Sequence, residues 1–341
     1  MNLIINKEFN DLYGILSSFM IISNYNYFKN QMEEKWNLTL DDEMERDIRK
    51  LLENPIFRKG KYFVDMNMKT KDIFINPTCI FKSKDLDEYF KYLNQQSEDD
   101  LRISIFEQLE FEELINYKEE SYLNIALEKI EKMYFNGDEK WYLLSLIKDP
   151  KYYIKKFSNL IKEYSPLYEG IKKKYWKVYK EFVQWIDEKL SEQGIDFIDE
   201  YLSFINLKQN DEVHLNYSIF DLISSYNFGD RSIHIFIGLI FERYVEEEKN
   251  KNDIDKHLNI YKVLSDKTRF DIIKILIKNE SYGQEIAEQL GITTATVSYH
   301  MDFLFGASLV TIQRKSRRLY YSINKEQIRK GISFLEKELM L

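Results

Sequence analysis

Residues 281–304 carry the pattern that most constrains the fold, because they encode two short amphipathic helices joined by a tight turn. We expect Ser281 to cap the first helix, with Gln284 completing a capping box, and Gly291 to end it in the left-handed conformation. Thr293 is placed to cap the second helix. A helix-turn-helix unit of this kind is small, so the rest of the chain should position or regulate it.

The second helix of this pair has the composition of a helix that reads DNA. Val297, Met301 and Leu304 recur at helical spacing and should face inward. Small polar side chains are left on the outside, which suits a helix that enters the major groove. The residues that we expect at or beside this DNA-facing surface are Thr293, Thr294, Ala295, Thr296, Ser298, Tyr299 and His300.

A β-hairpin is predicted next, because segments 309–314 and 319–323 alternate between apolar and polar residues. Four basic residues lie within five positions at its tip, namely Arg314, Lys315, Arg317 and Arg318. Short basic hairpins beside a helix-turn-helix can follow the minor groove and neutralise phosphates. An ordinary charged turn is the alternative, and the closeness of the two elements in sequence favours DNA contact.

Three further helices are predicted around this unit. Two precede it, one over residues 254–263 and one that starts within residues 264–276, and the last spans residues 326–340 and follows it. The apolar stripe of the last helix has no obvious partner within so small a domain. That stripe consists of Ile328, Ile332, Leu335 and Leu339.

The order of these motifs resembles the ArsR-type winged-helix repressors of bacteria, over about a quarter of the chain. The matching segments are Leu264-Ser265-Asp266-x-Thr268-Arg269, then Ile286-Ala287-x-x-Leu290-Gly291-Ile292-Thr293-x-x-Thr296-Val297-Ser298-x-His300, then the basic hairpin. The resemblance implies a homodimer that places one recognition helix in each half-site of a palindromic operator. It also implies dimer contacts through the first and last helices, at Leu258, Tyr261, Ile328, Ile332, Leu335 and Leu339.

The chain departs from that family pattern at its metal sites. Many relatives sense metals through cysteines in the first helix of the helix-turn-helix, and others bind zinc through histidines in the last helix. This chain has neither, so we expect no metal and no cofactor. In addition, Asp302 stands where relatives often carry a basic residue, and Ser308 where they usually have glycine. An acidic group near phosphate should weaken DNA binding modestly.

The charge of the chain is divided unevenly. The net charge is −8 over 341 residues, a length that suggests two or three domains. From Asn252 onward there are 14 Lys and Arg against 11 Asp and Glu, or +3, which leaves −11 for the preceding residues. Phosphate repels acidic surfaces, so DNA contact should be confined to the C-terminal part. The charged run 246–252 predicts a boundary between domain 1–250 and domain 251–341.

The N-terminal domain is predicted to be mostly α-helical with a small β element. Ser165 and Pro166 should begin a long helix that Gly194 ends. Other helices are expected near 12–20, 40–52, 84–93, 98–116, 121–135 and 139–147, and Trp176 and Trp185 are interpreted as core residues rather than the lining of a pocket. The least readable part of the chain is 56–81.

The β element should consist of segments 213–219 and 233–237, with residues 227–230 between them, and this small sheet could include a first strand near residue 4. His214 and His234 could face each other across this sheet and bind a metal or an anion. We favour the alternative that they sit singly on its polar face.

The remaining features narrow the class of protein. Cys79 is the single cysteine, and neither a signal peptide nor a membrane span is expected, which predicts a cytoplasmic protein. We find no nucleotide loop or catalytic triad motif, so an enzyme is not expected. The sequence predicts a regulator that binds double-stranded DNA, with a small-molecule or protein effector read by the N-terminal domain. The alternative is a protein-interaction module that uses the winged helix for contact with a protein.

Overall fold

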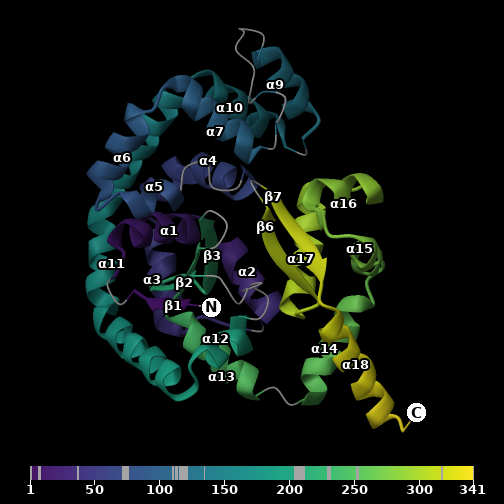
Figure 1. The fold of residues 1–341 in the computed structure, drawn as a ribbon. Helices are drawn as coiled ribbons and strands as arrows, with labels where there is room; N and C mark the ends of the chain where they lie inside the picture. The colour runs from purple at the N-terminus through teal and green to yellow at the C-terminus, as the bar shows by residue number, and fades with distance from the viewer. Residues whose placement is uncertain are drawn as a thin grey trace.

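The N-terminal region is built from helices around one small sheet, and the C-terminal region forms a second unit (Figure 1). The structure is a computed structural model. It describes residues 2–6, 9–36, 38–70, 77–109, 111, 114, 122–133, 135–202, 212–228, 232–250, 253–315 and 318–340. The N-terminal helices are α1 (Asp11–Ser23), α2 (Tyr25–Trp36), α3 (Asp42–Leu52), α4 (Pro55–Thr70), α5 (Pro77–Lys82), α6 (Leu86–Gln95), α7 (Glu98–Gln108), α9 (Tyr122–Glu131), α10 (Gly137–Lys148), α11 (Pro150–Gln193), α12 (Ile195–Leu202) and α13 (Ile240–Asn250). The predicted class, mostly α with a small β element and a C-terminal winged helix, is confirmed.

The N-terminal sheet has four strands in the order β1-β2-β4-β3. They are β1 (Asn2–Ile5), β2 (Glu212–Tyr217), β3 (Ile223–Phe228) and β4 (Ser232–Ile237). β1, β2 and β4 are parallel, and β3 is antiparallel to β4. The first strand near residue 4 is thus confirmed. The two predicted segments are β2 and β4, and the structure adds a third strand between them in sequence, β3, which was not predicted. Asn227 and Phe228 end this strand, and Gly229 and Asp230 lie outside the described residues.

The two histidines of this sheet are neighbours. The parallel register sets Ile4 beside His214 and His214 beside His234. The two imidazole rings stack with 4.2 Å between their centroids and 4° between their planes. His214 also lies against Glu212, with Nε2 2.7 Å from Oε1. The expectation that each histidine sits singly is wrong, and within the described part of the chain no group of three or more potential ligands surrounds them.

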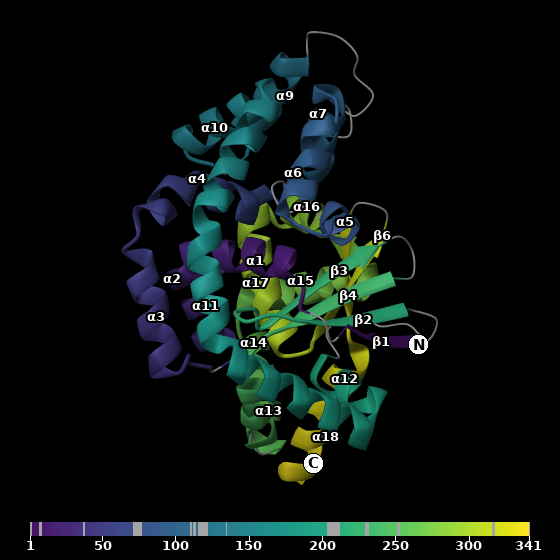
Figure 2. The same cartoon turned by 90° about the vertical axis from the view of Figure 1, so that its left-hand side faces the viewer.

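The long helix α11 covers one side of the N-terminal region and runs along the viewer's side in Figure 2. At 44 residues it begins at Pro150, so the prediction that a helix begins at Ser165 and Pro166 is wrong. Pro166 lies inside the helix, although proline removes one backbone hydrogen bond there. The buried stripe runs through this point, with Tyr164 and Tyr168 both packed in the core. Continuous burial on both sides of Pro166 therefore outweighs its local preference.

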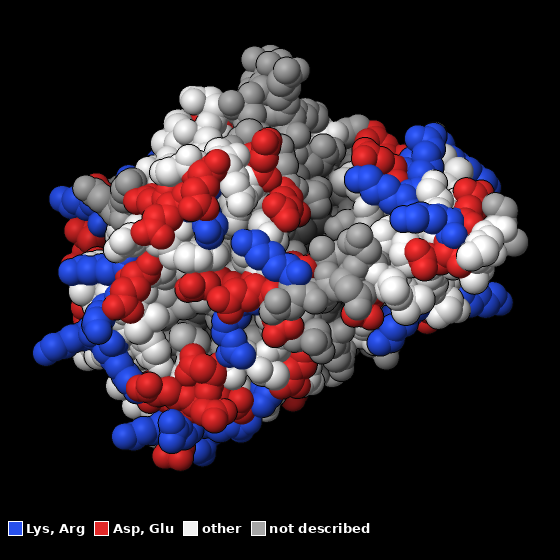
Figure 3. Space-filling view, turned by 90° about the horizontal axis from the view of Figure 1, so that it is seen from below, with Lys and Arg blue, Asp and Glu red and all other residues white. Residues whose placement is uncertain are grey.

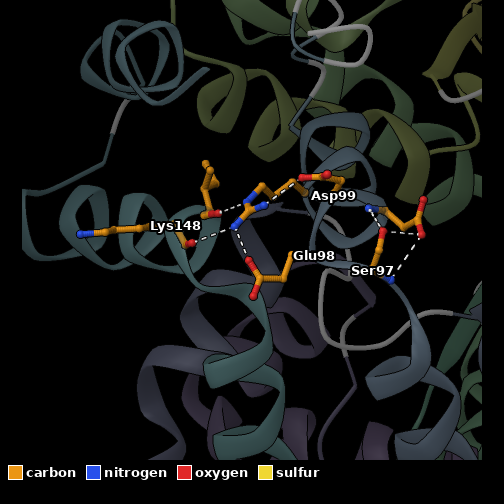
Figure 4. Close-up of polar contacts among 7 residues, drawn as sticks. Ser97, Glu98, Asp99 and Lys148 are labelled. Carbon is orange, nitrogen blue, oxygen red and sulfur yellow. Dashed lines mark hydrogen bonds and ion pairs between the residues drawn. The ribbon is translucent and has the colours of Figure 1, made fainter. Parts of the chain in front are cut away.

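Packing along α11 organises the helices around it. It packs against α1, α4, α6 and α7. Trp176 stacks on Tyr179 at 5.1 Å between ring centroids and meets Phe9 edge to face, which agrees with its interpretation as a core residue. Near the start of α11, Arg102 of α7 forms ion pairs with Glu98 and Asp99 of its own helix. Its guanidinium also donates hydrogen bonds to the carbonyl oxygens of Ile147 and Lys148 (Figure 4). These bonds attach α7 to the end of α10.

The buried apolar side chains form two clusters that share no residue. The first contains members from Leu12 to Val245, and the second contains members from Ile260 to Val310. Each cluster therefore has its own apolar interior, which is the usual mark of separately packed units.

The surface of the N-terminal region is charged. Figure 3 shows acidic side chains gathered over the larger part of the molecule, with lysines and arginines interspersed among them. This distribution agrees with the excess of negative charge before residue 252. Among the described residues, no helix combines the length and apolar character needed to span a lipid bilayer.

Candidate nucleic-acid interface

The C-terminal unit arranges its helices around a three-stranded antiparallel sheet of order β5-β7-β6. Its elements are α14 (Asp253–Leu264), α15 (Lys267–Lys278), β5 (Ser281–Tyr282), α16 (Gly283–Leu290), α17 (Thr294–Gly306), β6 (Val310–Lys315), β7 (Arg318–Ile323) and α18 (Lys325–Glu338). The helices α16 and α17 form the helix-turn-helix, and β6 with β7 forms the wing.

The turn between α16 and α17 follows from two residues. Gly291 has a φ of 65°, a left-handed conformation that favours glycine. Thr293 then caps α17, with its Oγ1 accepting a hydrogen bond from the backbone N–H of Thr296 at 3.0 Å. Both features agree with the prediction from sequence.

The start of α16 differs from the prediction. Ser281 is buried in β5, opposite Tyr321 of β7, and does not cap the helix. The N-cap is Tyr282, whose backbone N–H donates to the Glu285 carboxylate at 3.2 Å. The N-cap therefore lies one residue later than predicted, because Ser281 is part of strand β5 and pairs with β7.

The helix α17 is anchored by one face and open on another. Val297, Met301 and Leu304 are buried in the second apolar cluster. Thr294 and Ser298 are exposed, and the Tyr299 side chain is 48 % exposed. The inward and outward faces therefore fall as the helical spacing predicts, and the outward face offers hydroxyl groups to a ligand.

Three residues predicted for the interface have structural partners. Thr293 and Thr296 bond to each other through their hydroxyl oxygens, 2.8 Å apart, at the helix cap. The His300 side chain is only 12 % exposed, and its Nδ1 lies 3.7 Å from Asp266 Oδ1. Burial lowers the pKa of His300, although the Asp266 charge opposes this shift. His300 thus faces α15 rather than the open side of α17, so we leave it out of the proposed base-contacting set.

A small network ties α15 to α17. Asp266 caps α15 by accepting from the backbone N–H of Arg269 at 2.9 Å, and this hydrogen bond lowers the pKa of Asp266. The Arg269 guanidinium lies over the ring of Phe303, 4.7 Å from its centroid. These contacts hold the start of α15 against α17. In sequence, Asp266 and Arg269 appeared as motif positions without an assigned role.

The wing is a regular hairpin in its backbone. Val310 pairs with Ile323, and the register continues to Lys315 opposite Arg318 at the tip. The side chains of Arg314, Lys315 and Arg318, like that of Ala295 in α17, lie outside the described part of the structure, and Arg317 lies outside it entirely. Arg314 and Lys315 therefore end β6, and Arg318 begins β7.

The helices α14 and α18 pack against each other within the chain. The Tyr261 hydroxyl donates to the Gly331 carbonyl oxygen at 2.5 Å, and the ring of His257 stacks on that of Phe334 at 4.2 Å. Ile328 belongs to the apolar stripe on α18 and packs against the second apolar cluster, so part of that stripe has an internal partner, contrary to expectation. Leu335 is half-buried. The apolar side chains that stay exposed on these two helices are Ile254, Leu258 and Ile332, and Leu339, the residue directly after α18, is exposed as well.

The fold and the exposed recognition helix define a winged helix-turn-helix domain of the DNA-binding type. The family model for bacterial regulatory proteins of the arsR family matches residues 266–311. Transcriptional repressor SdpR of Bacillus subtilis is 30 % identical over 77 residues, which span 23 % of this chain and 86 % of that protein. The chain therefore belongs to the ArsR family through its C-terminal domain, and it is a DNA-binding transcriptional regulator.

Other relatives match the same region over less of their length. The probable mercury resistance operon repressor of Streptomyces lividans is 26 % identical over 74 residues, covering 22 % of this chain and 59 % of that protein. HTH-type transcriptional regulator KmtR of Mycobacterium tuberculosis is 31 % identical over 72 residues, covering 21 % of this chain and 55 % of that protein. These relatives are regulators rather than enzymes.

Among solved structures, reduced HlyU from Vibrio cholerae N16961 matches 27 % of this chain and 94 % of its own, with 23 % identity and a TM-score of 0.22.

Proposed function

We propose that this protein binds a palindromic operator as a homodimer and that its N-terminal domain, residues 1–250, reads a small-molecule or protein signal. The observation that carries the proposal is the exposed face of α17, where Thr294, Ser298 and Tyr299 lie opposite the buried anchor residues. A helix anchored in this way can enter the major groove and present hydroxyl groups to base edges.

The wing supplies the second part of the proposed DNA contact. Arg314, Lys315, Arg317 and Arg318 would neutralise backbone phosphates beside the site that α17 reads. The +3 charge after residue 251 makes residues 251–341 the favourable side of the chain for a polyanion, whereas residues 1–250 would be repelled.

The proposed dimer contact is the exposed apolar face of α14 and α18. Leu258 is 51 % exposed, Ile332 53 % and Leu339 61 %, and burying such side chains against the same face of a second copy is favourable. A two-fold axis through this face would place one recognition helix at each of two operator half-sites. The absence of the family's cysteine and histidine ligands from the sequence favours a signal other than a metal.

A mobility-shift experiment tests the proposed function. The full-length protein should retard a labelled duplex that covers the region upstream of its own coding sequence, at about physiological salt, and unlabelled duplex of unrelated sequence should compete poorly. If the protein retards neither duplex at any salt concentration, the result would favour the alternative, in which the winged helix contacts another protein.

A further inference from the structure

The recognition helix α17 is in contact with a helix from near the N-terminus. Helix α2 of the N-terminal region packs against α17. In Figure 1, α2 lies beside α17 on the side of the N-terminal region that faces the winged helix. A segment close to the N-terminus thus meets the element proposed to read DNA.

Asp302 and Tyr27 lie at this contact. Tyr27 projects from α2 and is 46 % exposed. Its pKa is raised, first by burial and then by the negative charge of Asp302 on α17, the helix that α2 contacts. Asp302 is the acidic residue that departs from the family pattern. Because Asp302 lies on the helix that α2 contacts, its charge acts on a residue of the N-terminal region.

The face of α17 that meets α2 adjoins the face proposed to meet DNA. Ser298 and Asp302 are four residues apart and Tyr299 and Asp302 are three apart, so these side chains are neighbours on the helix surface. The major groove is about 12 Å wide and one helix with its side chains is about 10–12 Å across. A groove filled by α17 has no room for a second helix packed alongside it.

The interface between α2 and α17 is suited to separation. Tyr25 and Met32 of α2 belong to the first apolar cluster, while Val297 and Met301 of α17 belong to the second, and no buried apolar residue joins the two within the described part of the chain. Each helix can therefore keep its own anchor when the contact opens.

We propose that α2 competes internally with DNA: it holds α17 in a closed state, and the chain binds its operator only after α2 and α17 separate. This inference rests on the proposed DNA-binding function. A signal that binds more tightly when α2 and α17 are apart would raise the affinity of the protein for DNA. Bound DNA would in turn raise the affinity for that signal by the same factor.

Two opposite substitutions at Tyr27 in the full-length protein test the inference. Tyr27→Glu sets a second carboxylate beside Asp302, so it should open the contact and tighten binding to the upstream duplex by about tenfold or more. Tyr27→Lys sets an ammonium group there, so it should close the contact and weaken DNA binding. Both directions are opposite to the direct effect of these charges on a polyanion.

Tyr92 provides the matched control, since it is 39 % exposed on α6. Tyr92→Glu and Tyr92→Lys should leave DNA affinity unchanged or shift it in the ordinary electrostatic direction. Hydrogen exchange of peptides that span α17, measured without DNA, gives a second readout. Exchange should become faster in Tyr27→Glu and slower in Tyr27→Lys.

The outcomes separate this inference from the function on which it rests. If the wild type binds the duplex and Tyr27→Glu binds it no more tightly, the inference is overturned while the proposed function stands, whatever the exchange rates show. If none of the proteins binds DNA, both are overturned.

Discussion

The imidazole rings of His214 and His234 lie face to face on neighbouring parallel strands, 4.2 Å apart at their centroids. Burial first, and the neighbouring His214 second, lower the pKa of His234 to about 4. Phe81 covers the His234 ring as well, at 4.0 Å. The strand register therefore creates a histidine that stays neutral in the folded protein at pH values where an ordinary histidine is protonated.

This pair makes the stability of the protein depend on pH. A histidine in the unfolded chain titrates near 6.5, so the unfolded state takes up a proton between pH 6.5 and about 4 that folded His234 does not. The free energy of unfolding should therefore fall as pH drops through this window, by up to about 3 kcal/mol from His234. Urea unfolding at pH 7.5, 6 and 5 measures it.

His234→Phe removes the titrating group and retains an aromatic ring against Phe81. The variant should lose much less stability between pH 7.5 and pH 5 than the wild type does, and above pH 7 the two proteins should have parallel pH dependence. An equal loss in both proteins between pH 7.5 and pH 5 would assign the acid sensitivity to other groups.

The basic wing should supply salt-dependent affinity. Replacing Arg314, Lys315, Arg317 and Arg318 with alanine should weaken binding to all duplexes and flatten the dependence of log K on log salt, by about 0.9 for each phosphate that is no longer neutralised. Fluorescence anisotropy between low and physiological salt measures both effects. A quadruple alanine variant of exposed lysines on α11, at 155, 156, 173 and 177, removes the same charge far from the wing. Equal salt slopes for the wing variant and the wild type would disprove the assignment.

The exposed face of α14 and α18 should control assembly. Ile332→Glu introduces a charge that would be desolvated in the proposed dimer, and we expect the dissociation constant to rise by at least about tenfold. Ile277→Glu is the matched control, because Ile277 on α15 is also 53 % exposed. Sedimentation velocity over a concentration series measures the dimer dissociation constant of the wild type and of each variant. A wild-type protein that stays monomeric throughout the series would contradict the proposed dimer.

The cap at Asp266 should hold α15 and α17 together. Asp266→Ala removes the acceptor for the Arg269 N–H and the partner of His300, so the start of α15 should lose about 1 kcal/mol of local stability. Hydrogen exchange of the first turns of α15 measures this loss. Asp266→Asn retains a good capping group and should lie closer to the wild type. Identical exchange in wild type and Asp266→Ala would show that the cap contributes nothing.

The winged helix could be predicted from sequence because its signals are local. Gly291, Thr293 and the spacing of Val297 and Met301 each act over a few residues, and the structure agrees with each of them. The N-terminal sheet was harder, because β2 and β4 are parallel and the intervening β3 has little alternation to reveal it. Pairing of parallel strands depends on the whole fold rather than on a turn.

The packing of α2 against α17 could not be predicted from the sequence pattern. Tyr27 and Asp302 are partly exposed polar residues, so neither contributes to an apolar periodicity, and they are far apart in the chain. The same holds for Pro166, whose local preference suggested a helix start. In both cases tertiary packing decides, and single-sequence reasoning has access only to local preferences.

The parallel pairing of β1 with β2 has a consequence for synthesis on the ribosome. Asn2 pairs with Glu212, and β2 lies against β4, so the sheet is completed only once residue 237 has left the exit tunnel. Translation proceeds at roughly 5–20 residues per second, so the first strand waits for its partner for tens of seconds or less. The winged helix emerges after that point. Every newly made recognition helix therefore appears beside a domain that can already be folded, and its first available partner is its own chain.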